Sequence, residues 1–184
     1  MCHPNPLEAG TMDNKVVTTT CRAFNQMGVP SLRFNFRGIG QSEGESSGNH
    51  NEIEDLKAIL AFVREKHPSI RLFLGGFSFG AWVSYEVAQT YSCEHLLSIA
   101  PAVNRHQLSI NEHWNCPWTI VTGDQDEVVS ITDIYNWLVL HPASYHLIKC
   151  RGVGHFFHGQ LVMLKKTLIE RFSPVLIEQE AKNG

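Results

Sequence analysis

Residues 76–80 read Gly-Phe-Ser-Phe-Gly and place a serine where a strand-like run meets a helix-like run. The apolar run 71–75 is typical of a buried strand, and the run from Ala81 onward is typical of a helix. A direct strand-to-helix turn strains the serine backbone, and the flanking glycines remove Cβ atoms that would collide across the bend. A bare Gly-x-Ser-x-Gly match also occurs by chance in ordinary turns. In this context, the motif predicts a nucleophile at Ser78.

The chain of 184 residues suits a single domain spanning 1–184, with a core to residue 172 and a C-terminal tail over 173–184. Its composition, 43% hydrophobic and 18% charged, is that of a globular protein, and no apolar run approaches the roughly 20 residues that cross a bilayer. A net charge of -3 gives no long-range attraction for a polyanion, and the basic residues are scattered rather than gathered in one stretch. We therefore expect a soluble protein that binds neither membrane nor nucleic acid.

The cysteines are odd in number, widely spaced and without a Cys-x-x-Cys pair. They are Cys2, Cys21, Cys93, Cys116 and Cys150. This usage is typical of reduced, mostly buried thiols in a cytosolic protein. No charged segment followed by an apolar segment and a small-residue cleavage site is present, so the predicted localisation is cytoplasmic.

Apolar runs alternate with helical periodicities along the chain. Strands are expected over 31–36, 71–75, 96–100, 118–122 and 145–149, and helices over 14–27, 52–66, 81–91, 132–140 and 160–172. The later strand runs are apolar on both faces, as in parallel strands covered on both sides. Repeated strand-helix units predict an α/β fold with a mostly parallel, doubly wound sheet and helices on both faces.

A serine hydroxyl needs a base within hydrogen-bond reach and a third group to orient that base. The segment after the strand 118–122 carries Asp124 and Asp126, and the glycine-rich loop after the strand 145–149 carries His155 and His158. The carboxyl ends of parallel strands are where catalytic groups collect. Spacing alone leaves the choice between the two carboxylates, and between the two histidines, open.

Several motifs together resemble one family. They are His-Pro-Asn-Pro at 3–6, Gly-Thr-Met-Asp-Asn-Lys-Val-Val at 10–17, Arg-Phe-Asn-Phe-Arg-Gly-Ile-Gly-Gln-Ser at 33–42, the Ser78 motif, Gly-Asp-Gln-Asp-Glu-Val-Val at 123–129 and His-Phe-Phe at 155–157. On these residues the chain resembles small, lid-poor bacterial serine hydrolases of the α/β-hydrolase superfamily. The match covers nearly the whole chain.

The resemblance implies a role for each site residue. Ser78 is the implied nucleophile and His155 the implied general base. Asp126 is the implied orienting acid, because the family pattern is Gly-x-x-Asp-x-Val-Val. The oxyanion hole is expected to use the N–H of Phe79 and one N–H from the loop 3–7. Since Pro4 and Pro6 have no N–H, Asn5 and Leu7 are the candidates in that loop, and Asn5 is favoured by its position.

No cofactor or metal is expected. The loop 37–42 lacks the Gly-Lys-Ser/Thr ending of a P-loop and the spacing Gly-x-Gly-x-x-Gly, so it does not indicate a nucleotide site. His155 and His158 have no third ligand at fitting spacing. In the resembled family, the loop 37–42 is a structural turn near the site.

The start of the chain differs from that of the resembled family, in which about three strands precede the His-Pro loop. The third of them lies between the strands expected here at 31–36 and 71–75, whereas only Met1 and Cys2 precede His3. Three outcomes are open: the sequence is a fragment or has its start assigned too far downstream, the two flanking strands pair directly, or the chain is a non-catalytic remnant that binds a partner through an exposed sheet edge.

The expected function is hydrolysis of an ester or thioester of a small or chain-end acyl substrate through an acyl-enzyme intermediate. The connection between Ala100 and Pro117 is short and leaves little room for a lid, so an open site is expected. The alternative is a truncated, catalytically incompetent binding or interaction module of the same fold. The expected partner is the small-molecule substrate, and the sequence does not indicate an oligomeric state.

Overall fold

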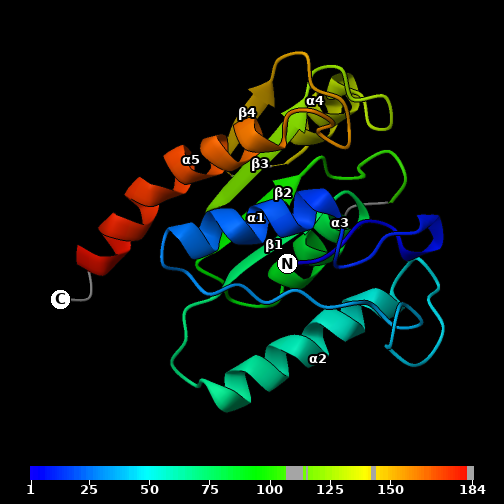
Figure 1. Cartoon of the computed structure of the whole chain (residues 1–184), viewed down its shortest axis with the longest axis vertical. Coiled ribbons are helices and arrows are strands. Elements are labelled where there is room, and N and C mark those ends of the chain that lie inside the picture. Colours follow the sequence, from blue (N-terminus) through cyan, green and yellow to red (C-terminus); the bar gives the residue numbers. More distant parts are fainter. Residues whose placement is uncertain (107–113, 115, 142–143, 182–184) are drawn as a thin grey trace.

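A computed structural model describes residues 1–106, 114, 116–141 and 144–181. Its described part contains one sheet of parallel strands in the order β1-β2-β3-β4 (Figure 1). The strands are β1 (Phe73–Phe77), β2 (His95–Ile99), β3 (Trp118–Gly123) and β4 (Tyr145–Cys150). Every residue of β2 and β3 is buried, as expected for central strands that are covered on both faces. The predicted α/β fold with a parallel sheet is confirmed.

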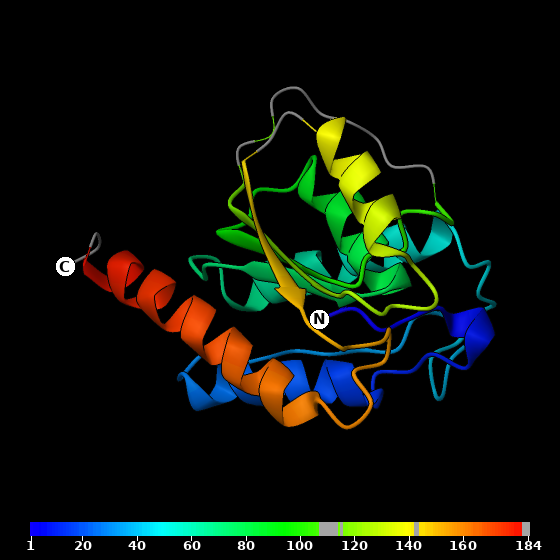
Figure 2. The ribbon, with the colours of Figure 1, turned by 90° about the horizontal axis from the view of Figure 1, so that it is seen from above.

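Helices cover both faces of the sheet (Figure 2). One layer holds α2 (Asn51–Lys66), α3 (Phe79–Ala88) and α4 (Ile131–Val139), and the other holds α1 (Lys15–Gln26) and α5 (Leu161–Ala181). Two buried apolar clusters fill the space between the sheet and these layers, one for each face. Among the described helices, none combines the length and apolar character needed to span a bilayer.

The helix ends follow local side-chain chemistry. Asn14 caps α1 by accepting a hydrogen bond from the Val16 N–H, and Ser130 and Asp133 form a reciprocal capping box at the start of α4. The helix predicted to end at residue 172 instead continues to Ala181, so the described part of the expected tail is helical. Pro174 is exposed on this helix and removes one backbone hydrogen bond without ending it.

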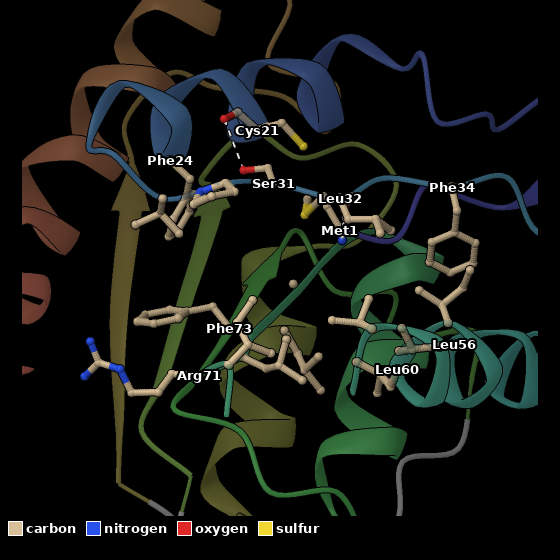
Figure 3. Close-up of a pocket in the computed structure, with 18 of the residues that line it drawn as sticks. Met1, Cys21, Phe24, Ser31, Leu32, Phe34, Leu56, Leu60, Arg71 and Phe73 are labelled. Atoms are coloured by element: carbon tan, nitrogen blue, oxygen red, sulfur yellow. Dashed lines mark hydrogen bonds between the residues drawn. The ribbon is translucent and has the colours of Figure 1, made fainter. Parts of the chain in front are cut away.

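The strand predicted over residues 31–36 is wrong, because this segment is extended but forms no ladder. It does not pair with β1; instead a groove of about 430 Å³ lies between them, lined by apolar side chains such as Leu32, Phe34, Leu60 and Phe73 (Figure 3). A strand is defined by backbone pairing with a neighbour, and the groove keeps that neighbour out of reach. The direct pairing considered for these two segments is therefore absent from the described structure.

Within the described part of the chain, only the chain start pairs with the free edge of β1. Cys2 forms a parallel bridge with Gly76; its N–H donates to Gly75 O at 2.8 Å and its carbonyl accepts from the Phe77 N–H at 3.2 Å. Backbone groups alternate in direction along a strand, so the carbonyl of Phe73 and the N–H of Gly75 also face the groove. No described residue bonds to them there. The bridge thus anchors the His3 loop beside the end of β1.

Burial on α5 predicts a clear contrast in stability. Leu164 is fully buried in the cluster between α5 and the sheet, whereas Val162 on the same helix is 85% exposed. We expect Leu164→Ala to lower the free energy of unfolding by about 2 to 5 kcal/mol and Val162→Ala to change it by less than about 0.5 kcal/mol. Urea unfolding followed by circular dichroism measures both. Equal losses for the two variants would contradict the packing of α5 described above.

Candidate active site

Ser78 stands alone between β1 and α3, at the bend that its motif predicts. Its backbone has φ 55° and ψ -116°, a conformation that residues with a side chain rarely adopt. The bend is held because the Ser78 N–H donates to Ile99 O at 2.9 Å, which ties it to the end of β2. The strained turn therefore presents the hydroxyl at the carboxyl edge of the sheet.

The two glycines of the motif have separate steric roles. A Cβ on Gly76 would lie 2.0 Å from the carbonyl oxygen of Gly80, so the strand and the first turn of α3 could not cross so closely. A Cβ on Gly80 would lie 2.5 Å from the carbonyl oxygens of Cys2 and His3. The second glycine therefore lets the chain start lie directly against the N-terminus of α3.

The structure brings Ser78, His155 and Asp126 into one hydrogen-bonded chain. His155 Nε2 lies 3.0 Å from Ser78 Oγ, and His155 Nδ1 lies 2.8 Å from Asp126 Oδ2. The second oxygen of Asp126 accepts from the N–H groups of Val128 and Val129 at 2.9 and 2.8 Å. Because both carboxylate oxygens are bonded, the Asp126 side chain is held in one orientation toward the imidazole.

The competing candidates lie elsewhere. Asp124 accepts a hydrogen bond from the Gly152 N–H at 2.7 Å, which joins the loops after β3 and β4. His158 is exposed, and its ring lies 5.7 Å from that of Phe156. Of the candidates that spacing left open, it is therefore His155 that contacts Ser78 and Asp126 that contacts His155.

Glu127 is a neighbour of the site that sequence reasoning missed. Its carboxylate accepts from the backbone N–H of His155 at 3.1 Å, and a Cβ on Gly154 would lie 2.7 Å from the same oxygen. The glycine before His155 therefore leaves space for the Glu127 carboxylate. The position of Glu127 directly after Asp126 was the sequence signal that could have identified it as a neighbour of the site.

The loop expected to complete an oxyanion hole lies at the N-terminus of α3. Asn5 caps the short 3₁₀ helix η1 (Pro6–Glu8), and its side-chain oxygen accepts from the Leu7 N–H at 3.0 Å. That N–H is thus already used locally. Among the described residues, none accepts from the N–H groups of Asn5 and Phe79, and the N–H groups of a first helical turn are free to bind a ligand. That the N–H groups of Asn5 and Phe79 form the oxyanion hole therefore stays a prediction.

His3 joins this loop to the segment 31–36. Its ring is fully buried, with Nδ1 donating to Pro4 O at 2.7 Å and Nε2 accepting from the Phe36 N–H at 3.0 Å. Burial lowers the pKa of His3, and this pair of hydrogen bonds requires the neutral ring. The His-Pro motif signalled the loop but not this function of the imidazole.

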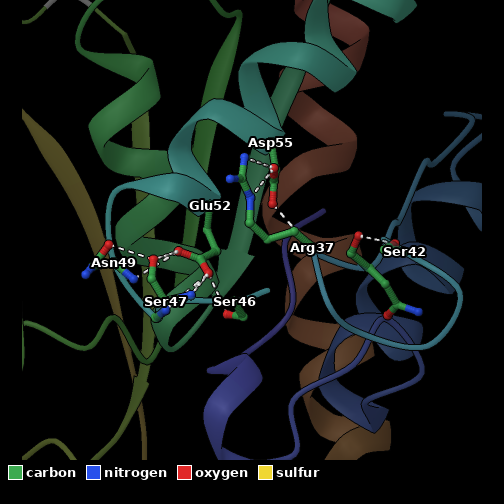
Figure 4. Close-up of polar contacts among 9 residues, drawn as sticks. Arg37, Ser42, Ser46, Ser47, Asn49, Glu52 and Asp55 are labelled. Atoms are coloured by element: carbon green, nitrogen blue, oxygen red, sulfur yellow. Dashed lines mark hydrogen bonds and ion pairs between the residues drawn. The ribbon is translucent and has the colours of Figure 1, made fainter. Parts of the chain in front are cut away.

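Glu52, at the start of α2, holds the loop 46–49 through hydrogen bonds to its carboxylate (Figure 4). Its buried carboxylate accepts from the Ser46 hydroxyl and from the N–H groups of Ser47, Gly48 and Asn49 at 2.9 to 3.1 Å. Nearby, Arg37 and Asp55 form a two-bond ion pair at 2.9 and 2.6 Å. A Cβ on Gly48 would lie 2.8 Å from the Leu7 side chain, so this loop supports the loop 3–7 directly.

The Glu52 carboxyl is stabilised in its charged form. Burial raises its pKa, but the hydrogen bonds from Ser46 and from backbone N–H groups outweigh burial and leave the pKa below its ordinary value. Among the described residues, no group of three His, Cys, Asp or Glu side chains is placed to hold a metal ion.

A lowered pKa of Glu52 gives a pH signature. Its contribution to stability is complete above the unfolded pKa of about 4.3 and is lost as the pH falls through the folded value. We expect Glu52→Gln to lower the free energy of unfolding at pH 7 by about 1 to 3 kcal/mol, with the difference from wild type shrinking below about pH 4. Urea unfolding across this range measures it. Glu54→Gln, on the exposed side of α2, is the control, and a pH-independent difference for Glu52→Gln would contradict the assignment.

This chain is similar in sequence to a known protein family and to a bacterial protein. A family model described as serine aminopeptidase, S33, matches residues 13–112. An uncharacterized protein of Rickettsia prowazekii is 35% identical over 178 residues, which cover 90% of this chain and 74% of that protein.

Two solved structures are similar over most of the chain. An α/β serine hydrolase homologue from Coxiella burnetii has a TM-score of 0.87 and 40% identity, covering 92% of this chain and 82% of its own. A serine hydrolase described as without lid, from Xanthomonas campestris, has a TM-score of 0.87 and 37% identity, covering 93% and 78%. With the parallel sheet and the Ser78 bend, these matches show that the chain belongs to the serine aminopeptidase S33 family of α/β hydrolases.

Proposed function

We propose that this protein is a serine hydrolase that cleaves an ester or thioester through an acyl-enzyme intermediate. The observation that carries the proposal is the hydrogen-bonded chain from Asp126 through His155 to Ser78, with the serine on a strained bend. A serine in this arrangement has both an adjacent base and a group that orients the base, which is what nucleophilic catalysis requires.

In the proposed reaction, Ser78 Oγ attacks the acyl carbon while His155 Nε2 takes its proton. Asp126 stabilises the imidazolium that forms, and the N–H groups of Asn5 and Phe79 stabilise the negative charge on the carbonyl oxygen. His155 then donates the proton to the departing alcohol or thiol. Water deprotonated by His155 attacks the acyl-enzyme, which releases the acid and restores Ser78.

We propose a small or chain-end acyl group as the substrate, together with a cytoplasmic location. The short connection after Ala100 supports an open site, although 107–113 and 115 lie outside the described residues, and the Xanthomonas campestris relative is described as lidless. Beside the nucleophile, the ring of His106 contacts that of Phe79 and stacks on that of Trp82, with centroids 5.2 and 4.4 Å apart. The five free cysteines fit a reducing compartment.

A second candidate function is that of a catalytically inactive interaction module. The open edge of β1 and the apolar groove beside it favour this candidate, because exposed edges can accept an added strand. The two candidates differ in whether Ser78 reacts.

The reactivity of Ser78 separates these candidates. We expect a fluorophosphonate probe to label the wild-type protein and the control Ser92→Ala, an exposed position away from the bend, but not Ser78→Ala. Labelling is measured by intact mass, and folding by circular dichroism. Folded wild-type protein that stays unlabelled would contradict the hydrolase proposal.

The acyl-chain preference tests the proposed substrate. We expect p-nitrophenyl acetate to be hydrolysed faster than long-chain p-nitrophenyl esters. A preference for long chains would refute the small-acyl assignment.

Two neighbouring aspartates provide a matched pair for the orienting acid. Asp126→Asn keeps an acceptor for the Val128 and Val129 N–H groups but cannot stabilise the imidazolium, so we expect kcat/KM to fall by about 10² to 10⁴-fold. Asp124→Asn keeps an acceptor for the Gly152 N–H and should stay within about threefold of wild type. Steady-state hydrolysis of p-nitrophenyl acetate measures both. Similar losses in the two variants would exclude the specific role of Asp126.

A further inference from the structure

Two thiols lie close together at the amino ends of the strands, whereas Ser78 lies at the carboxyl ends. Cys93 lies just before β2 and Cys116 lies two residues before the first residue of β3, and their Sγ atoms are 2.9 Å apart. A disulfide bond is about 2.05 Å long, so the two sulfurs need to approach by less than about 1 Å. All five cysteines of the chain are free thiols in the structure.

The backbone geometry supports bonding independently of the side-chain positions. In the register of β2 and β3, Leu96 lies opposite Trp118, and the Leu96 N–H donates to Pro117 O at 2.9 Å. If this register is extended toward the amino ends of both strands, Cys116 lies opposite residue 94, one residue away from Cys93. If the strand spacing of about 4.8 Å and the rise of about 3.3 Å per residue continue to these positions, their Cα atoms lie roughly 5.8 Å apart. Disulfides span about 4.4 to 6.8 Å, so the backbone needs little movement.

The two thiols are not equivalent. Cys93 is half-buried and lines a shallow depression of about 260 Å³ together with Arg64 and Arg71, whereas Cys116 is buried. The hydrogen bond from Cys116 lowers the pKa of Cys93, and the same contact raises the pKa of Cys116. The accessible sulfur is therefore the one favoured as thiolate, and the proton stays on its buried partner.

We propose that Cys93 and Cys116 are a modification site at which a peroxide forms a reversible disulfide. The Cys93 thiolate attacks one peroxide oxygen, the O–O bond breaks, and hydroxide leaves and is protonated to water. The resulting sulfenic acid is attacked by the Cys116 sulfur; the S–O bond breaks, and the hydroxide takes the Cys116 proton to leave as a second water. The two thiols lose two electrons and the peroxide gains them. A thiol reductant returns both cysteines to thiols by thiol–disulfide exchange and is itself oxidised to a disulfide.

The disulfide would join the segments that lead into the neighbouring strands β2 and β3. It closes a loop that contains all of β2 and the connection to β3, which stabilises the folded state by restricting the unfolded chain. For a loop of this size in a domain of this length, we expect the oxidised protein to melt about 5 to 10 °C above the reduced protein. Since the bond forms at the amino ends of the strands, it leaves the hydrogen bonds of Ser78 intact.

The test is a thiol count on the full chain and does not depend on hydrolase activity. After hydrogen peroxide treatment and removal of the peroxide, free thiols are alkylated in denaturant and the protein is digested and mapped. We expect the five free thiols to fall to three, with one peptide linking Cys93 to Cys116, and dithiothreitol to restore five. Differential scanning fluorimetry follows the melting temperature in parallel.

Single variants test the order of the steps. Cys116→Ser should leave Cys93 as a sulfenic acid that dimedone traps, whereas Cys93→Ser should prevent the disulfide. Cys21→Ser and Cys150→Ser, at buried positions outside the pair, should form it as wild type does. Five remaining thiols in peroxide-treated wild type, or a linkage between other cysteines, would overturn the proposal, and the wild-type peptide map decides this even if a variant fails to fold.

Discussion

The close crossing of β1 and the first turn of α3 is the constraint on which the site depends. Gly76 and Gly80 permit that crossing, and it forces Ser78 into its strained conformation. The same crossing admits the chain start beside the helix N-terminus, where the candidate oxyanion donors lie. Parallel strands then deliver Asp126 and His155 to the same edge, because all four strands end there. Local sterics and sheet topology together build the candidate site.

Features with a local signature could be predicted from the sequence. The helices begin and end near their caps and prolines, and the parallel strands follow their apolar runs. That Ser78, a histidine and an aspartate would lie at one edge of the sheet was also predictable, since each follows a predicted strand or lies in the loop after one. The error at 31–36 arose because strand-like composition describes a preference, whereas a strand needs a partner whose backbone lies within hydrogen-bond reach.

Hydrogen bonds from loop backbone to a side chain, and contacts between distant segments, could not be predicted. Glu52 reads as an ordinary acidic residue in a first helical turn, yet its buried carboxylate organises the loop 46–49, mostly through backbone N–H groups that have no sequence signature. His3 contacts Phe36 across 33 positions. Cys93 and Cys116 lie in different connections, and only the register of β2 and β3 brings them together. Such contacts depend on tertiary structure, which residue spacing does not encode.

The open edge of β1 gives its amide groups two different environments. On one side, N–H groups are engaged with β2; on the other, the Gly75 N–H faces the groove, and the Phe77 N–H is the one that a described residue, Cys2, accepts. Hydrogen–deuterium exchange should therefore alternate along this strand, with protection rising toward Ser78. The nucleophile is thus carried by a strand whose end is more firmly fixed than its beginning, and local opening of β1 can occur without release of the bend.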